Sequence, residues 1–154
     1  MFKRFAACIA IGITLGTAVW LLAYRLGPVV PASITGQVPF PVYAPASLPR
    51  GYSVDRRSVR YENGLVTYSL ASPLGLMVVT QQRRPDGFKA DQLGDQGFDE
   101  LQPFTVTIGP AMSGKQQGRM VGLVFAPQTL ISVNGPAGLS RESMQVVLAA
   151  LRGL

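Results

Sequence analysis

A run of twenty residues without a charged side chain, Phe5 to Tyr24, constrains this chain more than any other feature. As an α-helix that rises about 1.5 Å per residue, the run would be about 30 Å long, which matches the hydrocarbon core of a bilayer. We therefore predict a transmembrane helix over residues 5–24, preceded by a cytoplasmic stub of residues 1–4. Only 14% of the chain is charged, against roughly 25% in a typical soluble protein, and this shortage also favours a membrane segment.

The basic residues around this run indicate its orientation. Lys3 and Arg4 precede the run, and Arg25 follows it. Because basic residues favour the cytoplasmic side, we expect a single-pass protein of the cytoplasmic membrane with its N-terminus inside and its C-terminal domain outside. A cleaved signal peptide is the alternative, but its apolar stretch usually has only about 7–15 residues. The nearest small-residue site, residues 30–32, also contains a proline, so we favour an uncleaved signal anchor.

The composition excludes most familiar catalytic and metal sites. The chain has no histidine, a single cysteine, Cys8, and only eight acidic residues. It therefore lacks the side chains for common zinc sites, for Ser-His-Asp or Cys-His catalysis and for a disulfide framework. We predict that the protein is not an enzyme and has no catalytic residue, cofactor or metal.

One segment resembles a phosphate-binding loop without completing it. Residues 109–115 match G-x-x-x-x-G-K, but Gln116 stands where the motif needs a hydroxyl for magnesium, and Pro110 lacks an amide hydrogen. The residues that follow have the pattern of a strand instead of a helix. We interpret the segment as a glycine-rich hairpin loop.

The chain beyond the predicted membrane helix has two proline-containing parts. Residues 25–39 combine Gly, Pro and small side chains, and they predict a short stiff tether. From Phe40 the spacing of the prolines excludes a helix and disfavours a central strand. The apolar residues between these prolines predict that the segment wraps against the domain. A proline-rich ligand for a partner's aromatic groove is the alternative.

Turn signals divide the following residues into antiparallel strands. Asn63-Gly64 is a strong hairpin signal, and Ser72 to Gly75 contains a proline turn. The expected strands are 53–61, 65–71, 76–82, 104–108, 117–126 and 129–134. Residues 91–101 give only a weak helical signal, because two glycines interrupt it.

A C-terminal helix is better supported. Ser140 is a suitable N-cap, Glu142 lies in the first turn, and apolar residues at 144, 147, 148 and 151 share one face. We expect this helix to cover one face of the sheet. The prediction is therefore an α+β extracytoplasmic domain over residues 40–154, an antiparallel sheet packed with a C-terminal helix.

Four arginines are the candidate binding residues: Arg56, Arg60, Arg83 and Arg84. Alternation along a strand would place Arg56 and Arg60 on one face, and the other two end a different strand. Guanidinium groups suit phosphate headgroups and polymeric anions. Charges that protect an edge strand from pairing are the alternative interpretation.

The charge balance gives no reason to expect nucleic acid as a partner. Removing Lys3, Arg4 and Arg25 from the 14 basic residues leaves 11, against eight acidic ones, which is a net charge of +3. Five carboxylates between Asp86 and Glu100 match no calcium loop, and we interpret them as a solvated surface. A mildly basic outer domain is compatible with an anionic lipid or a wall polymer.

The order of three motifs adds a resemblance. Residues 40–52 (FPVYAPASLPRGY), Asn63-Gly64, and residues 131–140 (ISVNGPAGLS) before an amphipathic helix resemble small bacterial single-pass envelope proteins with an extracytoplasmic domain of unknown function. More loosely, they are similar to outer domains of anti-sigma factors and to lipoprotein-sorting-like domains. The resemblance implies an envelope location and no catalytic residue.

The expected function is that of a membrane-anchored extracytoplasmic binding module. Residues 5–24 would hold it in the lipid bilayer, and its partner would be an envelope protein, a wall polymer or an anionic lipid. The alternative is a carrier or sensor of an apolar envelope ligand. A cavity lined by Tyr68, Met77 and Met144 would favour that alternative.

Overall fold

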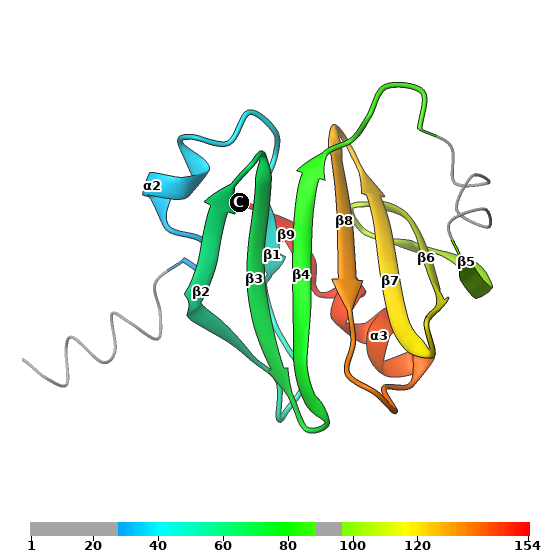
Figure 1. Cartoon of the computed structure of the whole chain (residues 1–154). Helices are drawn as coiled ribbons and strands as arrows, with labels where there is room; N and C mark the ends of the chain where they lie inside the picture. Colours follow the sequence, from blue (N-terminus) through cyan, green and yellow to red (C-terminus); the bar gives the residue numbers. More distant parts are fainter. Residues whose placement is uncertain (1–27, 89–96) are drawn as a thin grey trace, which may run out of the picture.

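The computed structural model describes residues 28–88 and 97–154 (Figure 1). The predicted membrane helix and the cytoplasmic stub lie outside these residues, and so does most of the weak helical segment at 91–101. None of the helices in the described ranges has the length and apolar character needed to cross a bilayer.

A seven-stranded antiparallel sheet is the largest part of the described chain, and the predicted α+β class is confirmed. Two meanders build the sheet, and β4 and β8 join them in the middle, so that the strand order is β2-β3-β4-β8-β7-β6-β5. The strands are β2 (Ser53–Glu62), β3 (Leu65–Ser72), β4 (Gly75–Arg83), β5 (Phe98–Val106), β6 (Gly109–Gln116), β7 (Arg119–Ala126) and β8 (Thr129–Asn134).

The predicted hairpin at Asn63-Gly64 is confirmed. Glu62 pairs with Leu65, and both turn residues have positive φ angles, 53° and 76°. This mirror-image turn matches the right-handed twist of the two strands that it joins. A turn of the same kind at Gln117-Gly118, with φ angles of 51° and 76°, joins β6 to β7.

The interpretation of residues 109–115 as a hairpin loop is wrong. These residues belong to β6, which pairs with β5 on one side and β7 on the other. The turn comes after them, because Gln117-Gly118 adopts the positive φ angles that a tight hairpin needs. Gly114 allows β5 to approach, since a Cβ there would lie 2.8 Å from the Asp99 carbonyl oxygen.

The weak prediction of a helix over residues 91–101 is wrong for residues 97–101, the part of this segment that the structure describes. Residues 98–101 form the first part of β5. Phe98 and Leu101 pack against Val121, Leu123 and Phe125 of β7. Tertiary contact between apolar side chains therefore overrides a weak local preference.

The predicted C-terminal helix is confirmed as α3 (Arg141–Ala149). Ser140 caps it, because its Oγ accepts a hydrogen bond of 3.2 Å from the Ser143 amide. The helix packs on β7 and β6 through Met144, Val147 and Leu148, which are buried. It ends before Leu151, however, and Leu151–Gly153 forms the short strand β9.

The proline-rich segment wraps against the domain, as predicted. Tyr43–Pro45 forms β1, which pairs with β9 in a separate two-stranded sheet. Buried apolar side chains precede and include this strand: Phe40, Val42, Tyr43 and Ala44. Because these side chains are in the core, the segment is not displayed as a ligand for a partner's groove.

The folded domain begins earlier than the predicted boundary at Phe40. Residues 28–39 contain the short helix α2 (Ala32–Thr35), and the Val30 side chain is only 1% exposed. Partly buried Ile34 and Val38 pack on the same core. The C-terminal part of the predicted tether is therefore part of the domain, because its apolar side chains find a buried surface that the local sequence does not reveal.

The two faces of the large sheet differ in what they pack against. The inner face carries buried residues of every second position, such as Tyr68, Met77 and Ile131, and belongs to the main core together with β1, β9 and α3. The outer face carries a smaller cluster on β7, formed by Val121, Leu123 and Phe125. Phe88 stacks on Phe125, with ring centroids 5.9 Å apart.

Candidate functional site

Arg56 and Arg60 lie in β2, an edge strand that is irregular between Asp55 and Arg60. Asp55 pairs with Ser69 and Arg60 pairs with Thr67, so five steps along β2 accompany two steps along β3. Regular alternation does not continue through this bulge. The spacing of Arg56 and Arg60 therefore no longer places the two side chains on one face.

Hydrogen bonds within the bulge use one of the candidate arginines. Arg60 Nη1 donates to the carbonyl oxygens of Arg57 and Val59, at 2.6 and 2.8 Å. Ser58 Oγ accepts a 2.7 Å hydrogen bond from the Ser69 amide of β3, and Asp55 Oδ1 accepts one from the Arg57 amide. Arg60 thus stabilises a backbone that has left the ladder, which gives it a structural role in the edge strand.

Arg83 and Arg84 lie two strands away, at the end of β4. Arg83 pairs with Thr129, and the Arg84 amide donates to the Gln128 carbonyl oxygen at 2.9 Å. Arg83 lies two residues after Gln81 in β4, so the two side chains are on the same, inner face. Arg60 pairs with Thr67 of β3, whose side chain is on the outer face. The register therefore assigns Arg60 and Arg83 to opposite faces of the sheet.

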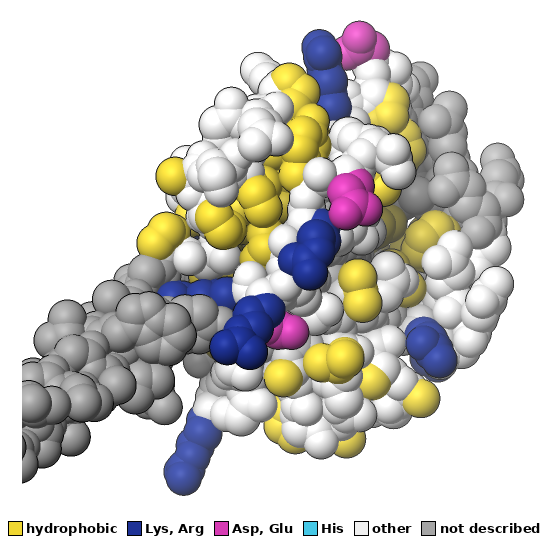
Figure 2. All heavy atoms as spheres, turned by 60° about the vertical axis from the view of Figure 1, so that its left-hand side comes forward, with side chains coloured by type: hydrophobic (Ala, Val, Ile, Leu, Met, Phe, Trp, Pro, Cys, Tyr) yellow, Lys and Arg dark blue, Asp and Glu magenta, His cyan; other side chains and the backbone are white. Residues whose placement is uncertain are grey.

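The four candidate arginines do not form one continuous basic surface. Figure 2 shows basic side chains in separate places on the face it presents, several of them beside an acidic side chain. Arg83 and Arg84 instead share a pocket of about 340 Å³ with Asp86, Phe88 and Gln128, among other residues. This pair is the closest grouping of the predicted binding residues.

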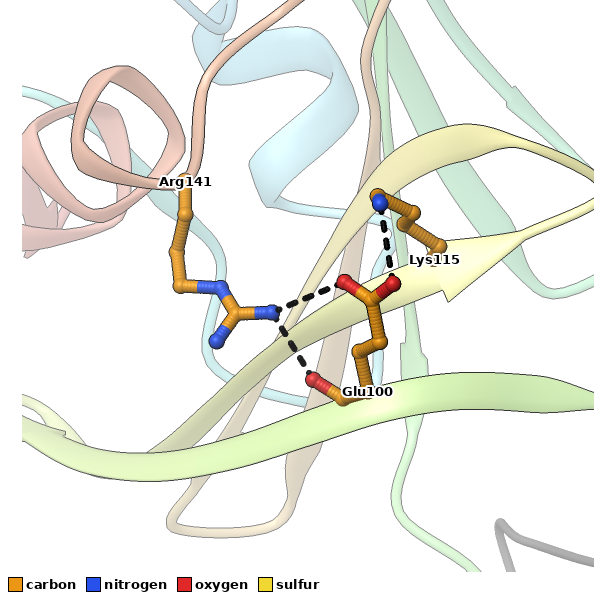
Figure 3. A network of polar contacts seen from close by, with 3 residues as sticks. All are labelled: Glu100, Lys115 and Arg141. Atoms are coloured by element: carbon orange, nitrogen blue, oxygen red, sulfur yellow. Dashed lines mark hydrogen bonds and ion pairs between the residues drawn. The ribbon is translucent and has the colours of Figure 1, made fainter.

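A polar network that sequence reasoning missed lies at the start of α3 (Figure 3). The Lys115 ammonium of β6 lies 3.0 Å from Glu100 Oε1, and Arg141 Nη2 of α3 lies 3.6 Å from Glu100 Oε2. Arg141 Nη2 also donates a 2.9 Å hydrogen bond to the Glu100 carbonyl oxygen. No local signal links the three residues, because they come from three elements that only the fold brings together.

This network borders an open groove of about 670 Å³ that includes Gln102, Ser140 and Glu142. The Glu142 backbone amide and the Ser140 hydroxyl donate hydrogen bonds to the Glu142 carboxylate and lower its pKa. Within the groove, Lys115 and Arg141 are already paired with Glu100. The network therefore links β5, β6 and α3 by ion pairs, and we do not interpret it as a binding site for a charged ligand.

The three residues that we expected to line a carrier's cavity fill the hydrophobic core instead. Tyr68, Met77 and Met144 are almost completely buried and belong to one hydrophobic core. Burial raises the pKa of Tyr68, whose hydroxyl donates a 3.2 Å hydrogen bond to the Tyr43 carbonyl oxygen. The pockets at Arg83 and at α3, and an apolar groove of about 440 Å³ next to Phe104 and Met112, have other linings.

In residues 28–88 and 97–154, no three His, Cys, Asp or Glu side chains are grouped so that they could hold a metal ion. The segment that resembles a phosphate-binding loop is strand β6, which leads into a hairpin turn, whereas a phosphate loop leads into a helix N-terminus. Residues 109–115 therefore lack the geometry of a phosphate-binding loop.

Comparison of the chain with protein-family models, with curated proteins and with solved structures found no match.

Proposed function

We propose that this chain is a single-pass membrane protein that displays its α+β domain as a binding module outside the cytoplasmic membrane. The twenty uncharged residues of the Phe5–Tyr24 run support the anchor, and Lys3 and Arg4 support an N-terminus inside. The resemblance to small envelope proteins agrees with this location.

One observation carries the choice of a binding module over a carrier. The inner face of the sheet, where an open curved sheet would hold an apolar ligand, is occupied by residues 40–45, which we call the lead-in, by β9 and by α3. Gln81 holds Tyr43 of the lead-in through two hydrogen bonds. Its Oε1 accepts from the Tyr43 amide at 2.8 Å, and its Nε2 donates to the Tyr43 carbonyl at 2.7 Å. Contacts with a partner must then use the outside of the domain.

The exposed basic side chains indicate which partners suit this outside surface. Arg83 and Arg84 are exposed and border one pocket, and planar guanidinium groups bind anionic oxygens well. An anionic lipid or wall polymer, or an acidic patch of an envelope protein, is the partner class that this site fits.

The location is tested by labelling single cysteines in intact cells. In the full-length chain with Cys8→Ser, the variant Thr107→Cys adds a thiol at an exposed position between β5 and β6. A membrane-impermeant maleimide should label it in intact cells, because the domain lies outside. The matched control Lys3→Cys should react only after lysis.

The reverse labelling pattern, or labelling of Thr107→Cys only after lysis, would overturn the proposed location. Loss of the protein from washed membranes would overturn the anchor. None of these outcomes depends on which partner the domain binds.

A further inference from the structure

Three neighbouring loops at one end of the domain combine exposed leucines with few charged side chains. Leu74 and Leu76, in and after the β3–β4 turn, are 57% and 64% exposed, and Val78 on the outer face of β4 is 43% exposed. Large apolar side chains exposed together mark a contact surface more often than isolated ones do.

Two other loops lie beside this turn. A Cβ at Gly51 would lie 3.2 Å from Pro73 Cγ, and a Cβ at Gly75 would lie 3.4 Å from Pro136 Cβ. The loop before β2, the β3–β4 turn and the loop between β8 and α3 therefore form one surface, at the lower end of the view in Figure 1. We call this surface, residues 47–52, 72–76 and 135–139, the hairpin end.

The charge of the hairpin end narrows the choice of partner. These three segments contain one charged residue, the exposed Arg50, and no acidic one. Leucines at the tip of a turn with a cationic residue beside them are suited to a bilayer interface, where apolar side chains enter the acyl region and arginine meets anionic headgroups.

The short connection to the predicted anchor puts a lipid surface close to the domain. Val30 is 1% exposed and belongs to the core, and the predicted membrane helix ends at Tyr24. Six residue steps span at most about 22 Å, because an extended chain advances about 3.3–3.6 Å per residue. The domain therefore stays within reach of the bilayer that holds its anchor.

We infer that the hairpin end docks on the surface of this same bilayer, with Leu74 and Leu76 inserted at the boundary between headgroups and acyl chains. The inference rests on the proposed membrane anchor and adds an orientation to it. A peripheral contact of this kind would fix which sides of the domain face outward toward a partner.

The test places an environment-sensitive NBD label at single cysteines of the full-length chain with Cys8→Ser. The protein is reconstituted in phosphatidylcholine vesicles that contain phosphatidylglycerol, with or without lipids that carry a nitroxide at a shallow acyl position. The test site is Leu76→Cys, with Leu74→Cys as a second variant. The matched control is Val146→Cys, since Val146 is a 49% exposed apolar residue on α3.

Insertion predicts blue-shifted emission and roughly twofold or stronger quenching by the nitroxide lipid at Leu76→Cys and Leu74→Cys, because both labels would lie about 5–10 Å into the interface. Quenching at Val146→Cys should be weak. Replacing phosphatidylglycerol by phosphatidylcholine should reduce quenching at the leucine sites, because Arg50 then loses its anionic partners.

Three results would overturn the inference. Chains that float with vesicles after a high-salt wash but show no quenching at either leucine site would keep the anchor and remove the docking. Blue-shifted labels that nitroxide lipids do not quench, and whose shift grows with protein concentration, would assign the hairpin end to a second copy. Chains that do not float with vesicles at all would remove the anchor, and the docking with it.

Discussion

At the scale of single residues, the candidate arginines differ in whether their side chains bond to the protein's own backbone. Arg60 donates two hydrogen bonds to carbonyl oxygens of the β2 bulge, so its replacement changes structure as well as charge. In the described part of the chain, the Arg83 and Arg84 side chains have no ion pair, and both are exposed. Binding and stability are therefore separable at Arg83 and Arg84 and coupled at Arg60.

Arg83→Gln combined with Arg84→Gln should weaken binding to anionic vesicles by about 2 kcal/mol, or about 30-fold, since each basic residue near an anionic surface contributes about 1 kcal/mol. Co-sedimentation of the full-length chain, held in neutral nanodiscs, with phosphatidylglycerol vesicles measures the change. The loss should shrink at high salt because screening weakens the wild-type contact.

Arg119→Gln is the matched control, because Arg119 is also exposed but lies at the start of β7. Equal binding by the double variant and the wild type would remove Arg83 and Arg84 from the binding surface.

Arg60→Lys should instead lower the free energy of unfolding by about 1 kcal/mol, the typical net value of a hydrogen bond.

At the scale of elements, one glycine sets the distance between α3 and the sheet. Gly122 of β7 lies under the helix, and a Cβ there would be 2.5 Å from Leu148 Cδ1 and 2.8 Å from Met144 Sδ. Close packing of this kind leaves little room for adjustment. Glycine is present here for close approach rather than for an unusual backbone angle.

Gly122→Ala should lower the free energy of unfolding by about 1–3 kcal/mol, because the added methyl group overpacks the contact with α3. Denaturant unfolding of the full-length protein in detergent micelles measures it. The same substitution in a Leu148→Ala background should cost less, because the shortened side chain leaves space for the methyl group.

Gly153→Ala serves as the control, since its Cβ would meet nothing closer than Tyr43 Cε1 at 3.8 Å. A Gly122→Ala variant within about 0.5 kcal/mol of the wild type, the range usual for surface changes, would contradict the close contact between α3 and β7.

At the scale of the whole molecule, the lead-in is held by central strands of the large sheet, and the C-terminal strand β9 is held by the lead-in. The lead-in is held by Gln81 of β4, and Thr129 of β8 donates a 2.7 Å hydrogen bond to the Pro41 carbonyl. β9 then pairs with β1, so the C-terminal residues depend on the lead-in. We expect these segments to open with the sheet rather than to fray separately.

Hydrogen exchange tests this cooperation. Peptides covering residues 40–46 and 150–154 of the full-length protein should exchange nearly as slowly as peptides from β3 and β4. Gln81→Met should speed exchange in both peptides and lower the free energy of unfolding by about 2 kcal/mol, because the buried Tyr43 amide loses its acceptor.

Gln82→Met is the matched control, because its side chain is on the opposite face and only half-buried. Fast exchange at 40–46 in the wild type would show that the ends fray. An unchanged exchange pattern in Gln81→Met would show that Gln81 does not hold the lead-in.

The sequence by itself determined the features that depend on nearby residues. Asn63-Gly64 specifies its turn because Asn and Gly tolerate positive φ angles, and Ser140 specifies a helix start because its hydroxyl reaches the Ser143 amide. The α+β class follows from such local signals, since each sets an element within a few residues. The predicted binding arginines and the membrane anchor remain predictions.

The tertiary structure alone decided the features that depend on distant residues. The β1–β9 pair joins residues more than one hundred positions apart, and Glu100, Lys115 and Arg141 meet from three elements. The β2 bulge breaks the alternation on which the face of Arg56 was inferred, and Val30 becomes core only because the rest of the domain offers it a buried surface. Pairing and burial are properties of contacts between segments, and local spacing carries no record of those contacts.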